Sequence, residues 1–165
     1  MNDAREVLRL VASRLHPDAA TPPSFGPLTV APAILLATER YPTVLTVMEM
    51  ARAAQMSRYH FIRVFHRETG LTPHGFLMRY RIVRAMDLLK ETDRGVGRIG
   101  QEVGYLNAAA FSRAFAELAG SPPQVYRILS RDPRAPAVPL QLTPTPPPLG
   151  QAGAFFSTAQ AIAAV

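Results

Sequence analysis

The sequence of 165 residues contains no cysteine, and only one of its 18 basic residues is lysine. The absence of cysteine excludes disulfides and thiol chemistry. No apolar run approaches the ~20 residues that a membrane-spanning helix needs. The N-terminal stretch MNDAREVLRLVASRLHP is charged throughout and lacks the apolar core of a signal peptide. We therefore expect a soluble, cytoplasmic protein with no membrane partner.

The sequence also lacks the residue patterns of metal sites and common catalytic sites. No nucleophile elbow, phosphate-binding loop or catalytic triad is apparent. No cysteine or carboxylate pattern completes a metal site around the histidines. The four histidines are His16, His60, His66 and His74. We therefore predict no cofactor, no metal and no enzymatic activity.

One pair of carboxylates has the spacing of an acid–base pair. Asp87 and Glu91 lie four residues apart and would share a helix face, as paired acid–base groups do. The neighbouring Arg84, Lys90 and Arg94 favour a solvated charged surface instead. An enzyme would also require a substrate-sized polar pocket. An enzymatic function is therefore the least favoured of the functions considered.

Positive charge is abundant and unevenly placed. The formal net charge is +6 and the sequence pI is about 10.5. Residues 40–134 hold 15 basic and 8 acidic side chains, which places a net charge of +7 in this region. A phosphate backbone is the natural partner, with affinity that falls steeply as salt rises. Charge alone also fits RNA, a membrane surface or an acidic protein.

Two stretches of the chain match each other at an offset of 50 positions. The first is SRYHFIRVFHRETGLTP at 57–73, and the second is NAAAFSRAFAELAGSPP at 107–123. At this offset, the same kinds of residue occupy equivalent positions of the two stretches: a helix cap, two aromatic residues, an arginine, a glycine and a proline. The six pairs are Ser57/Asn107, Phe61/Phe111, Arg63/Arg113, Phe65/Phe115, Gly70/Gly120 and Pro73/Pro123. These matches favour an internal duplication over two unrelated amphipathic helices.

Each stretch reads as a helix with defined ends, preceded by a shorter apolar helix pattern. Ser57 suits an N-cap, and Gly70 suits the left-handed residue after a helix. The preceding apolar trios are offset by 49, so the second turn should be one residue longer. These trios are Val47, Met50 and Ala54, then Val96, Ile99 and Val103. Helix, tight turn and capped helix together form the helix-turn-helix pattern.

From about Leu45 to Arg127 the chain resembles the DNA-binding domain of AraC/XylS-type transcriptional regulators. The resemblance is carried by MSRYHFIRVF at 56–65, ETGLTP at 68–73, VGY at 103–105, AFSRAF at 110–115 and GSPPQVYR at 120–127. It implies an all-α fold of about seven helices, with two helix-turn-helix subdomains joined by a long central helix. It also implies a sequence-specific transcription regulator, bound to double-stranded DNA in the bacterial nucleoid.

We divide the chain into three regions. Residues 1–27 should be an N-terminal helix and a linker, and residues 28–131 the DNA-binding domain. Residues 132–165 form a proline-rich tail without charge after Arg134, and its end could be a short docked helix or disordered. Within the domain we expect a first helix at 28–41, a support helix at 43–54, a second support helix within 92–103, helix-turn-helix motifs at 47–68 and 95–118, and a linking helix at 73–90.

The resemblance and the helical spacing predict two sets of DNA-contacting residues. The base-contacting set is Tyr59, Ile62 and Arg63 in the first motif, with Ala109, Ala110 and Arg113 in the second. The phosphate-contacting set is Ser57, Arg58, His60, Arg67, Asn107 and Ser112. Because alanines offer no hydrogen-bond code, we expect the first half-site to be read more stringently.

Several alternatives stay open at this point. Arg63 could instead pair with Glu68 or Asp87, and Arg113 could be a buried structural arginine. Arg79, Arg81 and Arg84 of the linking helix would be solvated or near phosphates. Gln55 falls at the turn position where relatives often have glycine, and a left-handed residue other than glycine costs roughly 1 kcal/mol, so this turn should be either strained or differently shaped. The rival function is a protein-interaction module that contacts RNA polymerase or a partner subunit and binds DNA only weakly. Binding as a monomer and a homodimer through the chain ends both remain open.

Overall fold

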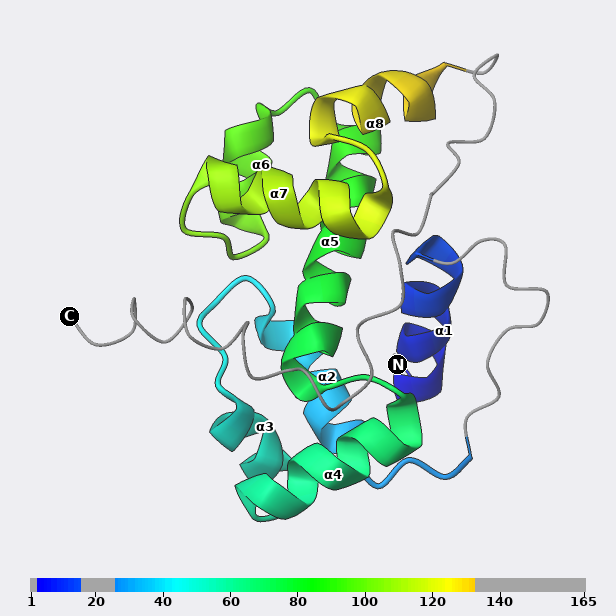
Figure 1. Cartoon of the computed structure of the whole chain (residues 1–165), viewed down its shortest axis with the longest axis vertical. Coiled ribbons are helices and arrows are strands. Elements are labelled where there is room, and N and C mark those ends of the chain that lie inside the picture. The colour runs from blue at the N-terminus through cyan, green and yellow to red at the C-terminus, as the bar shows by residue number, and fades with distance from the viewer. Residues whose placement is uncertain (1–2, 16–25, 133–165) are drawn as a thin grey trace.

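The structure is a computed structural model that describes residues 3–15 and 26–132, and this part of the chain is entirely helical (Figure 1). The helices are α1 Ala4–Leu15, α2 Ala31–Arg40, α3 Val47–Ala53, α4 Arg58–Thr69, α5 Pro73–Glu91, α6 Val96–Glu102, α7 Ala108–Ala119 and α8 Pro123–Arg131. The predicted all-α fold is confirmed, with α2 to α8 as the seven expected helices. The predictions for the tail after Asp132 and for His16 fall outside the described residues.

The long helix α5 runs through the middle of the molecule, with α2 to α4 around one end and α6 to α8 around the other (Figure 1). Its first turn is capped by Thr72, whose hydroxyl accepts from the amide of Gly75 at 3.0 Å. At 19 residues, α5 is about 28 Å long. The predicted core residues Phe76, Leu77, Tyr80 and Val83 are buried.

Two neighbouring leucines of α5 contact the core to different extents. Leu88 is half-buried and packs against the core, whereas Leu89 is fully buried. Ile82, Ala85, Met86 and Leu89 form a second buried row at helical spacing. Because α5 is covered on more than one side, its apolar pattern gives a weak signal for which leucine points inward.

Helix α3 with α4, and helix α6 with α7, form two helix-turn-helix units, called here the first and the second unit. The first support helix begins later than predicted. The side chain of Thr46 accepts from the amide of Glu49 at 3.2 Å, and the amide of Thr46 donates to the Glu49 carboxylate at 2.8 Å. This capping box starts α3 at Val47 rather than at residue 43. The second support helix, α6, lies within the predicted range 92–103.

The turns of the two units differ by one residue, as predicted. The first turn has Gln55 at φ 55°, and the second has Gly104 at φ 92°. The amide after each of these positions donates back into the support helix: Met56 to Ala51 and Tyr105 to Gly100, both at 2.9 Å. Of the two alternatives for Gln55, a strained left-handed turn or a different shape, the structure has the left-handed conformation. The additional residue of the second turn follows Gly104.

Gly100 of α6 allows close packing of the second unit. A Cβ at this position would lie 2.8 Å from Cγ of Phe111. The Phe111 ring itself is fully buried and meets the rings of Tyr105 and Phe115 at centroid distances of 5.4 and 5.7 Å. The missing side chain thus lets the second helix of the unit pack closely against the first.

The amino end of α2 is capped by a residue from a distant part of the chain. Val30 precedes α2 and offers no side-chain hydrogen bond. The Glu68 carboxylate, in the last turn of α4, accepts from the Thr29 amide at 2.8 Å, the Thr29 hydroxyl at 2.6 Å and the Val30 amide at 3.3 Å. A carboxylate here satisfies free amides and complements the helix dipole.

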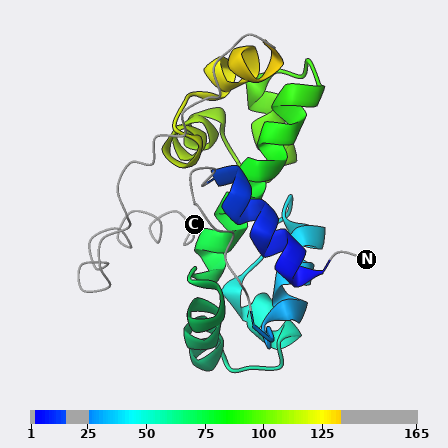
Figure 2. The same cartoon turned by 90° about the vertical axis from the view of Figure 1, so that its right-hand side faces the viewer.

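Helix α1 lies across α2 and α5, as Figure 2 shows from the side. Its buried face consists of Ala4, Val7, Leu8, Val11 and Leu15. The guanidinium of Arg14 lies 3.1 Å from the Asp87 carboxylate of α5. The predicted N-terminal helix is therefore present and packs on the helices that follow it. No helix among the described residues is long and apolar enough to span a membrane.

Candidate nucleic-acid interface

Helix α4 has one buried side and one basic side. The Ser57 hydroxyl accepts from the amide of His60 at 3.4 Å, and Gly70 ends the helix at φ 72°. Phe61, Val64 and Phe65 are buried. The residues on its exposed side are Arg58, Tyr59, His60, Arg63 and Arg67, with Ile62 half-buried beside them.

Two of the predicted base-contacting residues on α4 lie together. The side chain of Tyr59 is 74% exposed, and Cζ of Arg63 lies 5.8 Å from the centroid of its ring. This cation–π contact holds the guanidinium at the surface without burying its hydrogen-bond donors. The pair therefore presents one aromatic ring and one planar donor group to the solvent.

The alternative of an ion pair for Arg63 fails. The Glu68 carboxylate is occupied by the start of α2, with a longer contact of 3.9 Å to Arg67. Asp87 pairs with Arg14 and Arg84, at 3.1 and 3.3 Å. Within residues 3–15 and 26–132, Arg63 forms no ion pair.

Helix α7 repeats the buried side of α4 but not its exposed side. The Asn107 side-chain oxygen accepts from the amide of Ala110 at 2.7 Å, and Gly120 ends the helix at φ 71°. Phe111, Phe115 and Ala119 are buried. The predicted contacts Ala109 and Arg113 are exposed, whereas Ala110 and Ser112 are half-buried.

The charge on α7 was only partly anticipated. Arg113 is exposed and forms no ion pair in the described part of the chain, so the reading as a buried structural arginine is wrong. Glu117, which is also exposed, was not considered. Glu117 of α7 lies 50 positions after Arg67 of α4, so a negative side chain takes the place of a positive one. An alignment of the two duplicated stretches would have shown this change of charge. A carboxylate here opposes the approach of a phosphate backbone.

Many arginines of the basic region are engaged within the protein. Arg81 of α5 donates from Nε to the carbonyl of Tyr41 and from Nη2 to that of Thr43, both at 2.8 Å. Arg131 of α8 donates from Nε to the Lys90 carbonyl at 3.0 Å. Arg94 and Arg98 both pair with Glu102. The placement of Arg81 as solvated or near phosphates was therefore wrong, because loop carbonyls occupy its donors.

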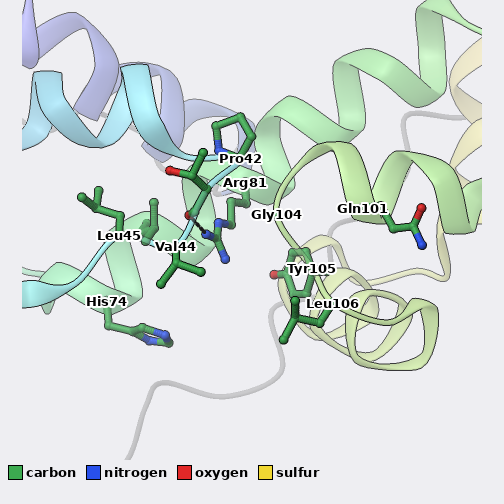
Figure 3. Close-up of a pocket in the computed structure, with 11 residues that line it drawn as sticks. Pro42, Val44, Leu45, His74, Arg81, Gln101, Gly104, Tyr105 and Leu106 are labelled. Carbon is green, nitrogen blue, oxygen red and sulfur yellow. Dashed lines mark hydrogen bonds between the residues drawn. The ribbon is translucent and has the colours of Figure 1, made fainter. Parts of the chain in front are cut away.

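The two units meet at a cleft beside α5 (Figure 3). Its volume is about 310 Å³. The exposed side chains of Val44 and Leu106, from the loop before α3 and the turn before α7, lie at its margin. His74 also lines it, and burial together with the nearby Arg81 lowers the pKa of that imidazole. No group of three histidines, aspartates or glutamates in the described ranges could hold a metal ion.

Known proteins match this arrangement. A family model described as a helix-turn-helix domain matches residues 50–128. The crystal structure of the DNA-binding domain of AdpA in complex with a target DNA is 30% identical, with a TM-score of 0.59. The match covers 62% of this chain and 93% of that domain. The chain belongs to the AraC-type helix-turn-helix family.

Two further known proteins match half of the chain or more. A regulator from Chromobacterium violaceum with an AraC-type DNA-binding domain shares the fold at 23% identity and a TM-score of 0.61, over 64% of this chain and 94% of that one. The MmsAB operon regulatory protein of Pseudomonas aeruginosa is 35% identical over 83 residues. That match covers 50% of this chain and 27% of the regulator, so the AraC-type domain spans only part of such relatives.

Proposed function

We propose that this chain is a sequence-specific DNA-binding transcription regulator, in which α4 and α7 each enter one of two adjacent major-groove segments. In this proposal residues 28–131 form the DNA-binding domain. Tyr59, Ile62, Arg63, Ala109, Ala110 and Arg113 face bases, and the predicted phosphate-contacting residues lie along the groove edges. The DNA-bound AdpA domain supports duplex DNA as the ligand.

The observation that carries the proposal is the exposed arginine at the same position of both duplicated helices. Arg63 and Arg113 are exposed, and neither forms an ion pair in the part of the chain that the structure describes. A planar guanidinium can bond O6 and N7 of one guanine together, which is the commonest specific contact in the major groove. Each helix is also buried on its opposite side by two phenylalanines, so its free side projects from a rigid support.

The arrangement of the units supports simultaneous binding by one chain. In Figure 1, α4 and α7 both begin on the left of the molecule and run towards the right. They are joined by the 19 residues of α5, about 28 Å of helix. One DNA turn, about 34 Å, separates equivalent major-groove positions on one face of the duplex. A single chain could therefore reach two successive segments without a second subunit.

The test is selection of bound sequences from a random pool of duplex DNA at about 150 mM salt, where nonspecific phosphate contacts are already weakened. We expect a motif with two blocks about 10 base pairs apart, the first sharper than the second. The selection is repeated with Arg63→Ala and with Arg113→Ala. Each variant should lose preference in one block only. Arg9→Ala, on the exposed side of α1, matches the change in charge and should alter neither block.

Two results would contradict the proposal. One is a selection in which no sequence is enriched although the protein is folded. The other is an Arg63→Ala variant that retains every base preference of the unchanged protein. In either case the rival function, an interaction module for RNA polymerase or a partner subunit, would have to explain the two units.

A further inference from the structure

The helices of the two units pack against α5 and within their own unit rather than extensively on each other. A second contact is therefore needed to fix their relative orientation, because a single linking helix leaves rotation about its ends. One place in the structure supplies such a contact. We call it the interunit junction, formed by residues 41–43 of the loop before α3, Arg81 of α5, and Gly104 and Tyr105 of the second turn.

Arg81 connects all three segments of the interunit junction (Figure 3). Its Nε and Nη2 donate to the carbonyls of Tyr41 and Thr43, both at 2.8 Å. Its Cζ lies 5.9 Å from the centroid of the Tyr105 ring. The loop belongs to the first half of the domain and Tyr105 to the second unit, so one guanidinium touches both halves.

The backbone of the second turn approaches the same point closely. A Cβ on Gly104 would lie 2.8 Å from the Tyr41 carbonyl oxygen, 2.9 Å from the Pro42 carbonyl oxygen and 2.9 Å from Cζ of Arg81. No side chain fits between the turn and the loop. Gly104 also has φ 92°, so two independent constraints favour glycine here.

We propose that Arg81 is a positioning residue for two-site DNA binding: it joins the loop before α3 to the turn before α7 and thereby fixes the separation of α4 and α7. The effect on DNA rests on the proposed function, whereas the effect on the separation does not. Arg81 itself contacts no DNA in this proposal. Its Nε and Nη2 already donate to loop carbonyls.

The arrangement of the two halves is measured without DNA, through labels on α2 and α8, which pack against α3 and α7. Because the chain has no cysteine, Glu39→Cys on α2 and Gln124→Cys on α8 create a single pair of spin-label sites at exposed positions. Distances between the labels are recorded by double electron–electron resonance. The labelled parent should give one narrow distribution. Arg81→Met, which keeps the length of the side chain and removes its donors, should broaden or shift it, and Arg9→Met should leave it unchanged.

A second variant disturbs the interunit junction from the opposite side. Gly104→Ala places a Cβ against the loop carbonyls and Arg81, and it should also broaden or shift the distribution. Its matched control is Gly70→Ala, which has a similar positive φ of 72° but open space around the new Cβ. If Arg81→Met fails to fold, Arg81→Lys and Gly104→Ala still test whether the interunit junction fixes the distance between the labels. A distribution that stays as narrow as that of the parent in folded Gly104→Ala and in a folded Arg81 variant would overturn the proposal.

The consequence for DNA is measured on duplexes that carry both selected blocks. Preorganisation of two linked modules contributes part of an avidity gain of roughly 10²–10⁴, so we expect Arg81→Met to bind such DNA about tenfold more weakly. Affinity for a duplex with one block should be unchanged. Moving the blocks apart by a base pair should cost the variant less than the parent. Equal losses on both kinds of duplex would contradict positioning, and an absence of sequence preference in the parent would contradict the proposed function alone.

Discussion

Helices α4 and α7 are alike on their buried sides and differ on their exposed sides. Each is capped by a polar side chain, buries two phenylalanines and ends at a glycine with φ near 70°. On the exposed side, the offset of 50 aligns Arg58 with Ala108, His60 with Ala110, and Arg67 with Glu117. Packing constrains the buried positions closely, whereas exposed positions are free to change with the ligand.

This difference assigns unequal tasks to the two units. The first unit offers several cations and an aromatic ring, and the second offers one arginine together with a carboxylate. The affinity for phosphates should come mainly from α4, and α7 should contribute shape, a thymine methyl contact and one guanine contact.

The largest effect should come from the shared core. Phe61→Ala and Phe111→Ala each remove a fully buried ring at matching positions. Each should lower the free energy of unfolding by about 3–5 kcal/mol. Urea unfolding followed by circular dichroism measures this, with the exposed Tyr59→Ala as control. A loss in only one of the two variants would show that the cores are not equivalent.

Exchange of the aligned charges should alter DNA binding by a smaller amount. Glu117→Arg gives α7 the charge of α4 and should raise affinity, and it should steepen the plot of log affinity against log salt by about 1. Arg67→Glu should do the reverse. Fluorescence anisotropy over a salt series measures both slopes. If Glu117→Arg leaves the slope unchanged, α7 does not lie near phosphates in the complex.

The N-caps of α4 and α7 should differ by a still smaller amount in their contribution to stability. Ser57 accepts from its amide at 3.4 Å and Asn107 at 2.7 Å, so the second cap makes the better hydrogen bond. Ser57→Ala and Asn107→Ala should each cost about 1 kcal/mol of stability, with the larger loss at Asn107. Thermal unfolding without DNA separates this cost from any loss of a phosphate contact. Equal losses would mean that cap geometry does not distinguish the helices.

Acid should weaken the capped start of α3, and this effect is the smallest. Hydrogen bonds from the Thr46 amide and hydroxyl, with Arg40 beside them, lower the pKa of Glu49 to about 2. A carboxyl with a lowered pKa stabilises the fold fully above its ordinary pKa of 4.5 and loses that contribution as the pH falls towards 2. Helix α6 has no side-chain cap at its start. At its end, the effect of burial is outweighed by hydrogen bonds from Arg94 and Arg98, so the pKa of the Glu102 carboxyl is also lowered.

Glu49→Gln tests this assignment. The difference in unfolding free energy between the parent and this variant should be constant above pH 5 and shrink as the pH drops below the ordinary carboxyl pKa. Chemical unfolding at a series of pH values gives the difference. A difference that does not vary with pH would show that the Glu49 carboxylate is not what holds the start of α3.

Patterns within short stretches of the sequence were sufficient to predict much of this fold. The spacing of Phe61 and Phe65, the glycines after each helix and the duplication predict α4 and α7 because cap, period and stop agree. The T-x-x-E pattern of Thr46 and Glu49 was also present, and its omission misplaced the start of α3.

Other features depend on contacts between distant residues. Arg63 and Arg81 are both arginines on helices, and only the carbonyls of Tyr41 and Thr43, about 40 positions away, distinguish a free guanidinium from an engaged one. The role of Gly100 likewise depends on Phe111 arriving from another helix. Exposure agrees with DNA contact at Arg63 and Arg113, and contact itself stays a prediction.

The carboxylate of Glu68 links the segment before α2 directly to α4. It accepts from Thr29 and Val30 and lies in the last turn of α4. Tension applied at Thr29 would therefore reach α4 through this carboxylate. A protein pulled from residue 26, so that α1 bears no load, should yield at a lower force when Glu68 is replaced by alanine, and force spectroscopy would register the difference. A pull on this segment would thus be transmitted to the helix whose exposed side carries Arg58, Arg63 and Arg67.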